Sequence, residues 1–174
     1  FSRITARRGF LLDNDTLDTI VTGGPSYFAI DVTVTGKAAH AGMEPEKGVN
    51  AIQAAARAIA ALTIGRLDHE TTANVGIIKG GMIRNGVPDT CTFAAECRSL
   101  THDRGQAVAD AMVGVIRREV EAFGARVTID VNNLCQASSI ANDAWTVRIA
   151  QQALSTLGIT ATAALMCGFT DASI

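Results

Sequence analysis

One histidine of this chain stands in a loop built almost entirely of small residues. His40 lies in the segment 36–42, GKAAHAG, which follows an alternating apolar and polar run and precedes Pro45, a residue that suits a helix start. Small neighbours let another molecule approach the imidazole closely, and the ring can donate a hydrogen bond to a developing oxyanion. A solvated loop histidine is the other interpretation of the same local pattern.

Three further polar residues have an ordinary structural interpretation when each is taken alone. Asp13 follows the apolar run 8–12 and could cap the turn at Asp15 or Thr16. Asn85 lies in the glycine-rich loop 80–89, GGMIRNGVPD, where asparagine favours a turn. Arg98 ends an alternating run and could form an exposed ion pair with Glu96, worth under about 1 kcal/mol.

The elements that would position these residues follow from hydrophobic periodicity. Alternation predicts strands over 28–34, 72–79, 90–98 and 127–131. Helical spacing predicts one helix that begins at Pro45 and ends before Gly65, and a second over 103–123. The first helix is expected to turn one apolar face to the core, formed by Val49, Ile52, Ala56, Ile59 and Leu62. The order β-α-β-β-α-β predicts an α+β, ferredoxin-like sandwich, an antiparallel sheet with two helices on one face.

Shorter elements flank this unit on both sides. Short strands are predicted over 8–13 and 19–21, and Gly23-Gly24-Pro25 indicates a boundary. A helix over 143–157, a strand over 159–165 and a polar loop at 168–171 suit a returning α/β domain. We therefore expect a domain fragment over 1–25, the ferredoxin-like domain over 26–135 and a returning fragment over 136–174.

Composition excludes several classes of protein. The chain has 174 residues, a net charge of -2 and 18% charged residues, which argues against a nucleic-acid surface. It has neither an apolar run of about 18 residues nor a basic-then-apolar leader, so no membrane association is expected. His69 and His102 are interpreted as solvated surface residues. The cysteines form no Cys-x-x-Cys pair and predict reduced core residues of a cytoplasmic protein; they are Cys91, Cys97, Cys135 and Cys167.

The His40 segment and the helix predicted after it resemble the lid, or dimerisation, domain of the co-catalytic zinc exopeptidases. That family includes peptidase T, the glutamate carboxypeptidases, the aminoacylases and the succinyl-diaminopimelate desuccinylases, and the peptidase T-like branch fits best. The resemblance runs from Gly9 to Asp171. It implies a tripeptide aminopeptidase-like hydrolase of small peptides, with two zinc ions and a homodimer formed through the lid.

The resemblance also implies roles for three residues of the predicted lid. His40 would stabilise the oxyanion, in the active site of the partner subunit. Asn85 and Pro88 match a Gly-Gly…Asn-x-x-Pro motif whose asparagine contacts the substrate. Arg98 would clamp the terminal carboxylate of the substrate, a role that suits the planar guanidinium fork.

Two aspartates outside the lid acquire roles by the same resemblance. Asp13 would be a zinc ligand, although Asn14 replaces the glycine that usually follows it. Asp171 would line the substrate pocket, with Phe169 in place of a second glycine. The family's other zinc ligands lie outside this stretch, and the chain starts at Phe1 and stops at Ile174. We therefore expect a fragment that is inactive by itself.

A different class of function fits the same pattern of elements. A non-catalytic ferredoxin-like dimerisation or regulatory module would need none of these roles, because the fold alone does not imply a function. The zinc content of the complete protein would separate the two hypotheses.

Overall fold

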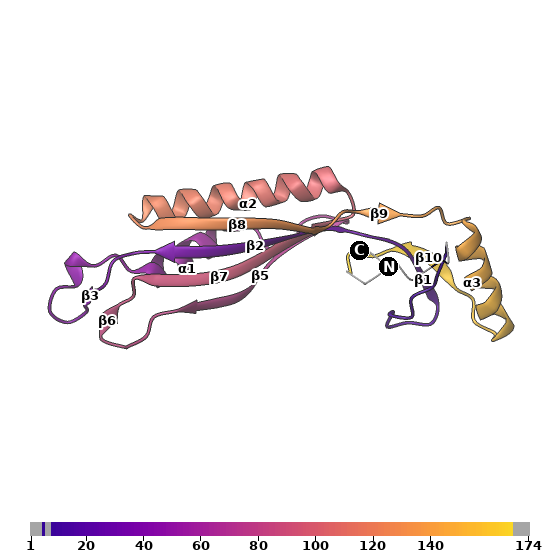
Figure 1. The fold of residues 1–174 in the computed structure, drawn as a ribbon, viewed down its shortest axis with the longest axis horizontal. Coiled ribbons are helices and arrows are strands. Elements are labelled where there is room, and N and C mark those ends of the chain that lie inside the picture. The colour runs from indigo at the N-terminus through magenta and orange to yellow at the C-terminus, as the bar shows by residue number, and fades with distance from the viewer. Residues whose placement is uncertain (1–4, 6–7, 169–174) are drawn as a thin grey trace.

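The computed structural model describes residue 5 and residues 8–168, and a five-stranded antiparallel sheet is its largest element (Figure 1). The strand order is β4-β5-β7-β2-β8. Four strands have ten residues each and form the body of the sheet: β2 (Ser26–Thr35), β5 (Thr71–Gly80), β7 (Thr90–Ser99) and β8 (Arg126–Cys135). The short strand β4 (Gly65–Arg66) pairs with Thr72 and Ala73 of β5.

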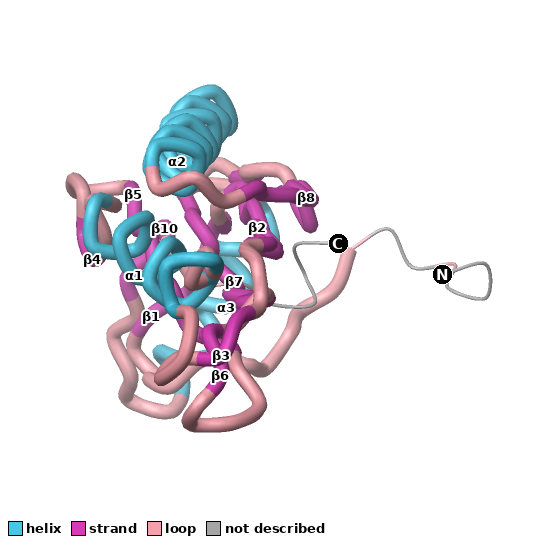
Figure 2. The backbone as a smooth tube through the Cα atoms, turned by 90° about the vertical axis from the view of Figure 1, so that its left-hand side faces the viewer, coloured by secondary structure: helices cyan, strands magenta, loops and turns pink. Residues whose placement is uncertain are grey.

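Two helices, α1 (Ala51–Ala61) and α2 (His102–Ala122), cover one face of this sheet (Figure 2). The chain order β2-α1-β5-β7-α2-β8 confirms the predicted ferredoxin-like arrangement. Alternate residues of the two central strands are at most 6% exposed and form the core with the helices: Phe28, Ile30, Val32, Val34, Cys91, Phe93, Ala95 and Cys97. No helix in the described part of the chain is long and apolar enough to cross a membrane.

The first helix differs from the prediction in its start and in its buried face. Pro45–Lys47 forms only a single 3-10 turn, and α1 begins after Asn50, whose side chain accepts a hydrogen bond from the backbone N of Gln53 (3.0 Å). The fully buried face consists of Ala51, Ala54, Ala55 and Ala58. Ile52 is 38% exposed and Ala56 is exposed. Alanine side chains let the helix lie close to the sheet, which leaves Ile52 and Ala56 on the flank. The other residues predicted for this face do pack on the core: Val49, Ile59 and Leu62.

A second, smaller sheet lies at the opposite end of the molecule from the short strands β3 (Ala39–His40) and β6 (Gly86–Val87) (Figure 1). Strand β1 (Thr19–Gly24) pairs in parallel with β10 (Thr162–Leu165) and antiparallel with β9 (Ser138–Ser139), and α3 (Trp145–Thr156) packs against β1. The helix and the strand predicted over 143–157 and 159–165 are present with shorter bounds, and the strand predicted over 19–21 extends to Gly24. Strand β9 was not predicted. The chain leaves this sheet through Pro25 and returns to it after Cys135.

The strand predicted over 8–13 is wrong. The structure shows no strand there, and Leu12 is 99% exposed and Phe10 58% exposed. A strand needs a neighbour to accept and donate its backbone hydrogen bonds. No described strand pairs with this segment.

The inward orientation of the α1 alanines can be tested with a matched pair of substitutions. Ala54→Leu should lower the free energy of unfolding by about 1–3 kcal/mol, because a fully buried site has no room for added methylenes. Ala60→Leu, at an exposed position of the same helix, should change it by less than about 0.5 kcal/mol. Urea titration of both variants measures the difference. Equal effects would show that the helix does not present this face to the sheet.

Candidate functional site

His40 and Asn85 lie together at one tip of the molecule. Strand β3 (Ala39–His40) pairs antiparallel with β6 (Gly86–Val87), so that His40 is opposite Gly86. The backbone N of Ala41 donates a hydrogen bond to the carbonyl O of Asn85 (2.9 Å). Figure 1 shows this ribbon beyond the end of the main sheet, far from the second sheet. Two residues that the sequence singled out separately therefore belong to one tip.

The backbone around His40 determines which ring nitrogen carries the proton. The Nδ1 atom accepts a hydrogen bond from the backbone N–H of Gly42 (3.2 Å). A nitrogen that accepts cannot carry the proton of a neutral imidazole, so this proton lies on Nε2. The carbonyl of His40 accepts from the backbone N of Met43 and of Glu44 (3.2 and 3.0 Å), which fixes the loop. The exposed neutral ring thus offers Nε2–H as a donor.

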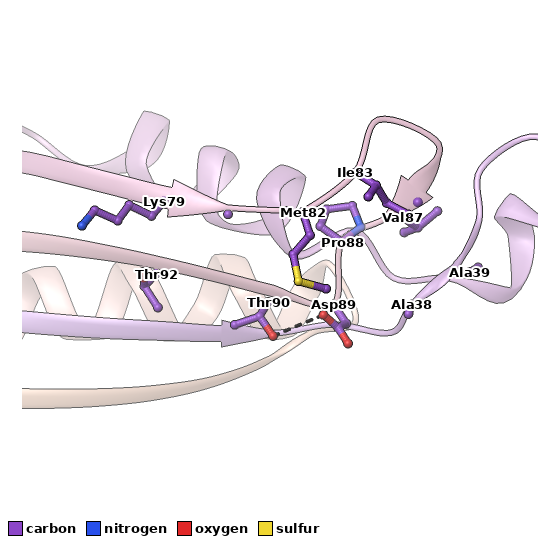
Figure 3. A pocket seen from close by; sticks show the side chains of 13 residues that line it. Ala38, Ala39, Lys79, Met82, Ile83, Val87, Pro88, Asp89, Thr90 and Thr92 are labelled. Atoms are coloured by element: carbon purple, nitrogen blue, oxygen red, sulfur yellow. Dashed lines mark hydrogen bonds between the residues drawn. The ribbon is translucent and has the colours of Figure 1, made fainter.

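An apolar groove of about 670 Å³ lies beside this tip (Figure 3). Its walls come from the start of the His40 loop and from the segment between β5 and β7, and include Ala38, Met82, Ile83, Val87 and Pro88. Met82 is 96% exposed and Ile83 is 67% exposed. The hydrogen-bonding groups of the tip therefore stand next to a surface that can hold an apolar part of another molecule.

Arg98 is part of a three-residue cluster at the other end of the sheet. Its Nε and Nη2 atoms donate to the two carboxylate oxygens of Glu96 (3.1 and 3.0 Å), and its Cζ lies 4.4 Å from the ring centroid of Tyr27. Its Nη1 atom donates to the carbonyl O of Cys167 (3.5 Å). The Arg98–Glu96 ion pair anticipated from the sequence is present, but it is partly buried, with 23% and 27% of the side chains exposed.

Burial and hydrogen bonding shift the pKa values within this cluster. Burial by itself would raise the pKa of Glu96, but hydrogen bonds from Arg98 and Tyr27 outweigh it and hold this pKa below its usual value. A hydrogen bond to Glu96 raises the pKa of the Tyr27 hydroxyl. Glu96 occupies the Nε–Nη2 edge of the guanidinium, and the carbonyl O of Cys167 and the Tyr27 side chain interact with it as well.

The predicted residues do not converge within one chain. Strand β7 runs from Thr90, beside the tip, past Arg98. At the tip, the backbone carbonyl O of Asp89 accepts a hydrogen bond from the backbone N of Gly36 (2.8 Å). Eight steps of about 3.3 Å each place Arg98 roughly 26 Å further along the sheet. The structure thus brings His40 and Asn85 together and holds Arg98 apart from them.

The described residues do not make a metal site. Asp13 is exposed, and the backbone N of Asp15, which Asp13 could have capped, donates instead to the Oδ1 of Asn14 (3.0 Å). No group of three or more His, Cys, Asp or Glu side chains could hold a metal ion within the described residues. Asp171 lies outside the described residues.

One histidine has a different environment from the one predicted. His69 is exposed, as expected, but His102 is half-buried, with its Nδ1 atom 2.9 Å from the fully buried hydroxyl of Ser26. The Ser26 hydroxyl also accepts from the backbone N of Ala137 (2.8 Å), where the chain returns to the smaller sheet. No local pattern could show this contact, because 76 positions separate the two side chains.

The protonation of His40 should be visible directly by NMR. In the uniformly ¹⁵N-labelled chain at a pH where the ring is neutral, the histidine Nε2 signal of His40 should be that of a protonated nitrogen, and its Nδ1 signal that of an acceptor. Long-range ¹H–¹⁵N correlation spectra measure both shifts. A protonated Nδ1 would contradict the hydrogen bond from Gly42.

Replacing Glu96 should destabilise the fold in a pH-dependent way. Glu96→Gln should cost about 1–3 kcal/mol at pH 7, because Arg98 loses its counter-charge. A carboxyl whose folded pKa is lowered stabilises above its unfolded pKa of about 4.3 and loses this contribution as the pH falls through the folded value. Thermal unfolding between pH 7 and pH 2 should therefore show the two proteins converging in acid. A gap that stays constant would exclude the ion pair as its cause.

Comparison with known proteins identifies the family to which this fold belongs. The model of the peptidase dimerisation domain, M20_dimer, matches residues 26–123. The uncharacterised protein YqjE of Bacillus subtilis is 33% identical over 174 residues, which are 99% of this chain and 47% of that protein. The chain spans about half the length of this curated relative.

Two solved structures resemble the whole described architecture. Aminopeptidase PepT from Bacillus cereus is 36% identical, with a TM-score of 0.84 over 99% of this chain and 46% of that chain. A tripeptidase from Staphylococcus aureus is 33% identical, with a TM-score of 0.82 over 90% of this chain and 42% of that one. On the family match and these similarities, the chain belongs to the M20 peptidase family and carries its dimerisation domain.

Proposed function

We propose that this chain is the dimerisation region, with adjoining parts, of a metal-dependent exopeptidase that cleaves small peptides. The similarity to an aminopeptidase and a tripeptidase over most of the chain supports this activity. A cytoplasmic location is part of the proposal and is supported by four free cysteines, three of them buried. Without a metal cluster among the described residues, the chain alone acts as a non-catalytic module.

The distance between the two ends of the sheet is the observation that supports an active site shared between subunits. An extended tripeptide spans about 10 Å, which is less than half of the roughly 26 Å that separates the tip from Arg98. One substrate cannot contact both ends of the same chain. A homodimer with two-fold symmetry can bring the tip of one subunit to the Arg98 end of its partner.

Each residue then has a role that its environment suits. The Nε2–H of His40 donates to the oxyanion formed from the scissile carbonyl, and the amide of Asn85 holds the substrate backbone. Arg98 binds the terminal carboxylate of the substrate, a role that suits its charge and its planar fork of donors. Asp171 lies outside the described residues, and its assignment to the substrate pocket rests on the resemblance alone. Asp13 is one ligand of a centre of two zinc ions, for which the described residues supply no second ligand.

A mixed-dimer experiment tests the shared site with residues of this chain alone. The chain would replace the matching segment of the Bacillus cereus aminopeptidase. In the resulting hybrid enzyme, His40→Ala should lower kcat by about 10²–10³ without loss of bound metal. Heterodimers of a His40→Ala subunit and an Arg98→Ala subunit should recover about half of the parent activity, because one of their two sites is intact.

The controls separate this result from general damage. Asp110→Ala, at an exposed position in the middle of α2, should leave kcat and metal content unchanged. Purified heterodimers with the activity of the weaker homodimer would show that each site belongs to one chain. Metal loss together with activity in His40→Ala would instead make His40 a metal ligand.

A further inference from the structure

A second arginine lies at the Arg98 end of the main sheet, and it has no counter-charge among the described residues. Arg66 of β4 is exposed and takes part in none of the ion pairs that the described residues form. Arg98, by contrast, has its Nη2 atom 3.0 Å from a carboxylate oxygen of Glu96. The positive charge that this end of the sheet can offer to a ligand is therefore mainly that of Arg66.

The register of the sheet puts the two arginines on one face. Arg66 is the cross-strand partner of Thr72, and Thr72 is the partner of Arg98. Arg98 is in turn opposite Tyr27. Side chains directly opposite one another on antiparallel strands point to the same side of a sheet, so these four residues form one row. Cys97, the neighbour of Arg98, is buried in the core under the helices, which places the row on the face that the helices leave open.

Both arginines approach the same residue of the segment that follows β10, where the main sheet adjoins the smaller one (Figure 1). The Nη1 atom of Arg98 donates to the carbonyl O of Cys167 (3.5 Å). Burial raises the pKa of the Cys167 thiol, and the positive charges of Arg66 and Arg98 act against this shift, so both guanidinium groups lie near the thiol. Two strand spacings of about 4.8 Å separate the Cα atoms of the arginines, with Thr72 between them. One small anion can therefore contact both side chains.

The other acidic side chains near this row have partners of their own. Glu70 accepts a hydrogen bond from the hydroxyl of Thr101 (3.2 Å), and Asp68 accepts one from the Nη2 atom of Arg104 (2.9 Å). Among the described residues, neither carboxylate forms an ion pair with Arg66. The guanidinium of Arg66 is thus available to an anion that this part of the chain does not supply.

We infer that Arg66 is a second substrate-binding arginine, which holds the terminal carboxylate of the peptide together with Arg98. This inference rests on the proposed peptidase function and adds a residue that determines specificity. Glu96 offsets the charge of Arg98, so a carboxylate that met Arg98 alone would meet an ion pair with no net charge. The uncompensated charge of Arg66 gives the row its attraction for an anion. It makes the site selective for peptides with a free terminal carboxylate over peptides that end in an amide.

A pair of substrates tests this role in the hybrid of this chain with the Bacillus cereus aminopeptidase. Arg66→Ala should lower kcat/KM for trialanine about 10- to 100-fold, mostly through KM, because a charge-assisted contact is lost. For trialanine amide, which has no carboxylate, the same variant should change kcat/KM by less than about twofold. Arg66→Lys should keep part of the preference for the free acid, because it retains the charge but not the fork. The matched control is Arg117→Ala, an exposed arginine of α2, which should affect neither substrate.

The outcomes separate this inference from the proposed function. Equal losses on both substrates would make Arg66 a structural residue and overturn the inference. If Arg98→Ala lowers activity on trialanine and Arg66→Ala does not, the inference fails while the proposed function stands. If neither variant changes this activity, the carboxylate role proposed for Arg98 fails as well.

An NMR titration gives a second test that needs no catalysis, because the 174-residue chain holds both arginines. Trialanine should shift the side-chain Nε–H signals of Arg66 and Arg98 with one common saturation curve, whereas trialanine amide should shift neither. The Nε–H signal of Arg117 should stay in place with both peptides. A saturable shift at Arg98 without one at Arg66, or equal shifts with peptide and amide, would overturn the inference.

Discussion

The pairing of β2 with a strand on each side is the constraint on which the rest of the structure depends. All ten residues of β2 are in register with β7, and nine of them with β8, while its alternate side chains fill the core under both helices. A strand held on three sides cannot bend without losing both ladders and the core contacts. The sheet therefore keeps its two ends roughly 30 Å apart, and each end carries different candidate residues.

Sequence periodicity predicted the elements that have one apolar face and failed where two faces are apolar. The strands 28–34 and 90–98 alternate cleanly, and Phe28 and Phe93 are buried as expected. In α1 both the alanine stripe and the isoleucine stripe fit a helical period, and pattern alone favoured the larger side chains. Packing chose the alanines, because a close helix–sheet approach excludes branched residues.

The sequence named the candidate residues one by one but did not show how they are arranged. The resemblance selected His40, Asn85 and Arg98, and nothing in their spacing shows that two share a tip while the third is held far away. The contact between Ser26 and His102 was equally hidden, because it joins segments 76 positions apart. Distances along a folded sheet depend on strand order and register, which one sequence without its relatives does not specify.

The double role of the Ser26 hydroxyl has a mechanical consequence for the junction between the two sheets. Within the described residues, two backbone segments connect the sheets at this junction, and the hydroxyl of Ser26 on one accepts from the backbone N of Ala137 on the other. The thiol of Cys135 also donates to the carbonyl O of Pro25 (3.2 Å). Twisting the two segments apart would break both hydrogen bonds and leave buried polar groups without a partner, at a cost of about 1–3 kcal/mol each. The two connecting segments are therefore expected to bend together more easily than they twist against each other. The main sheet and its tip then move as one body relative to the smaller sheet.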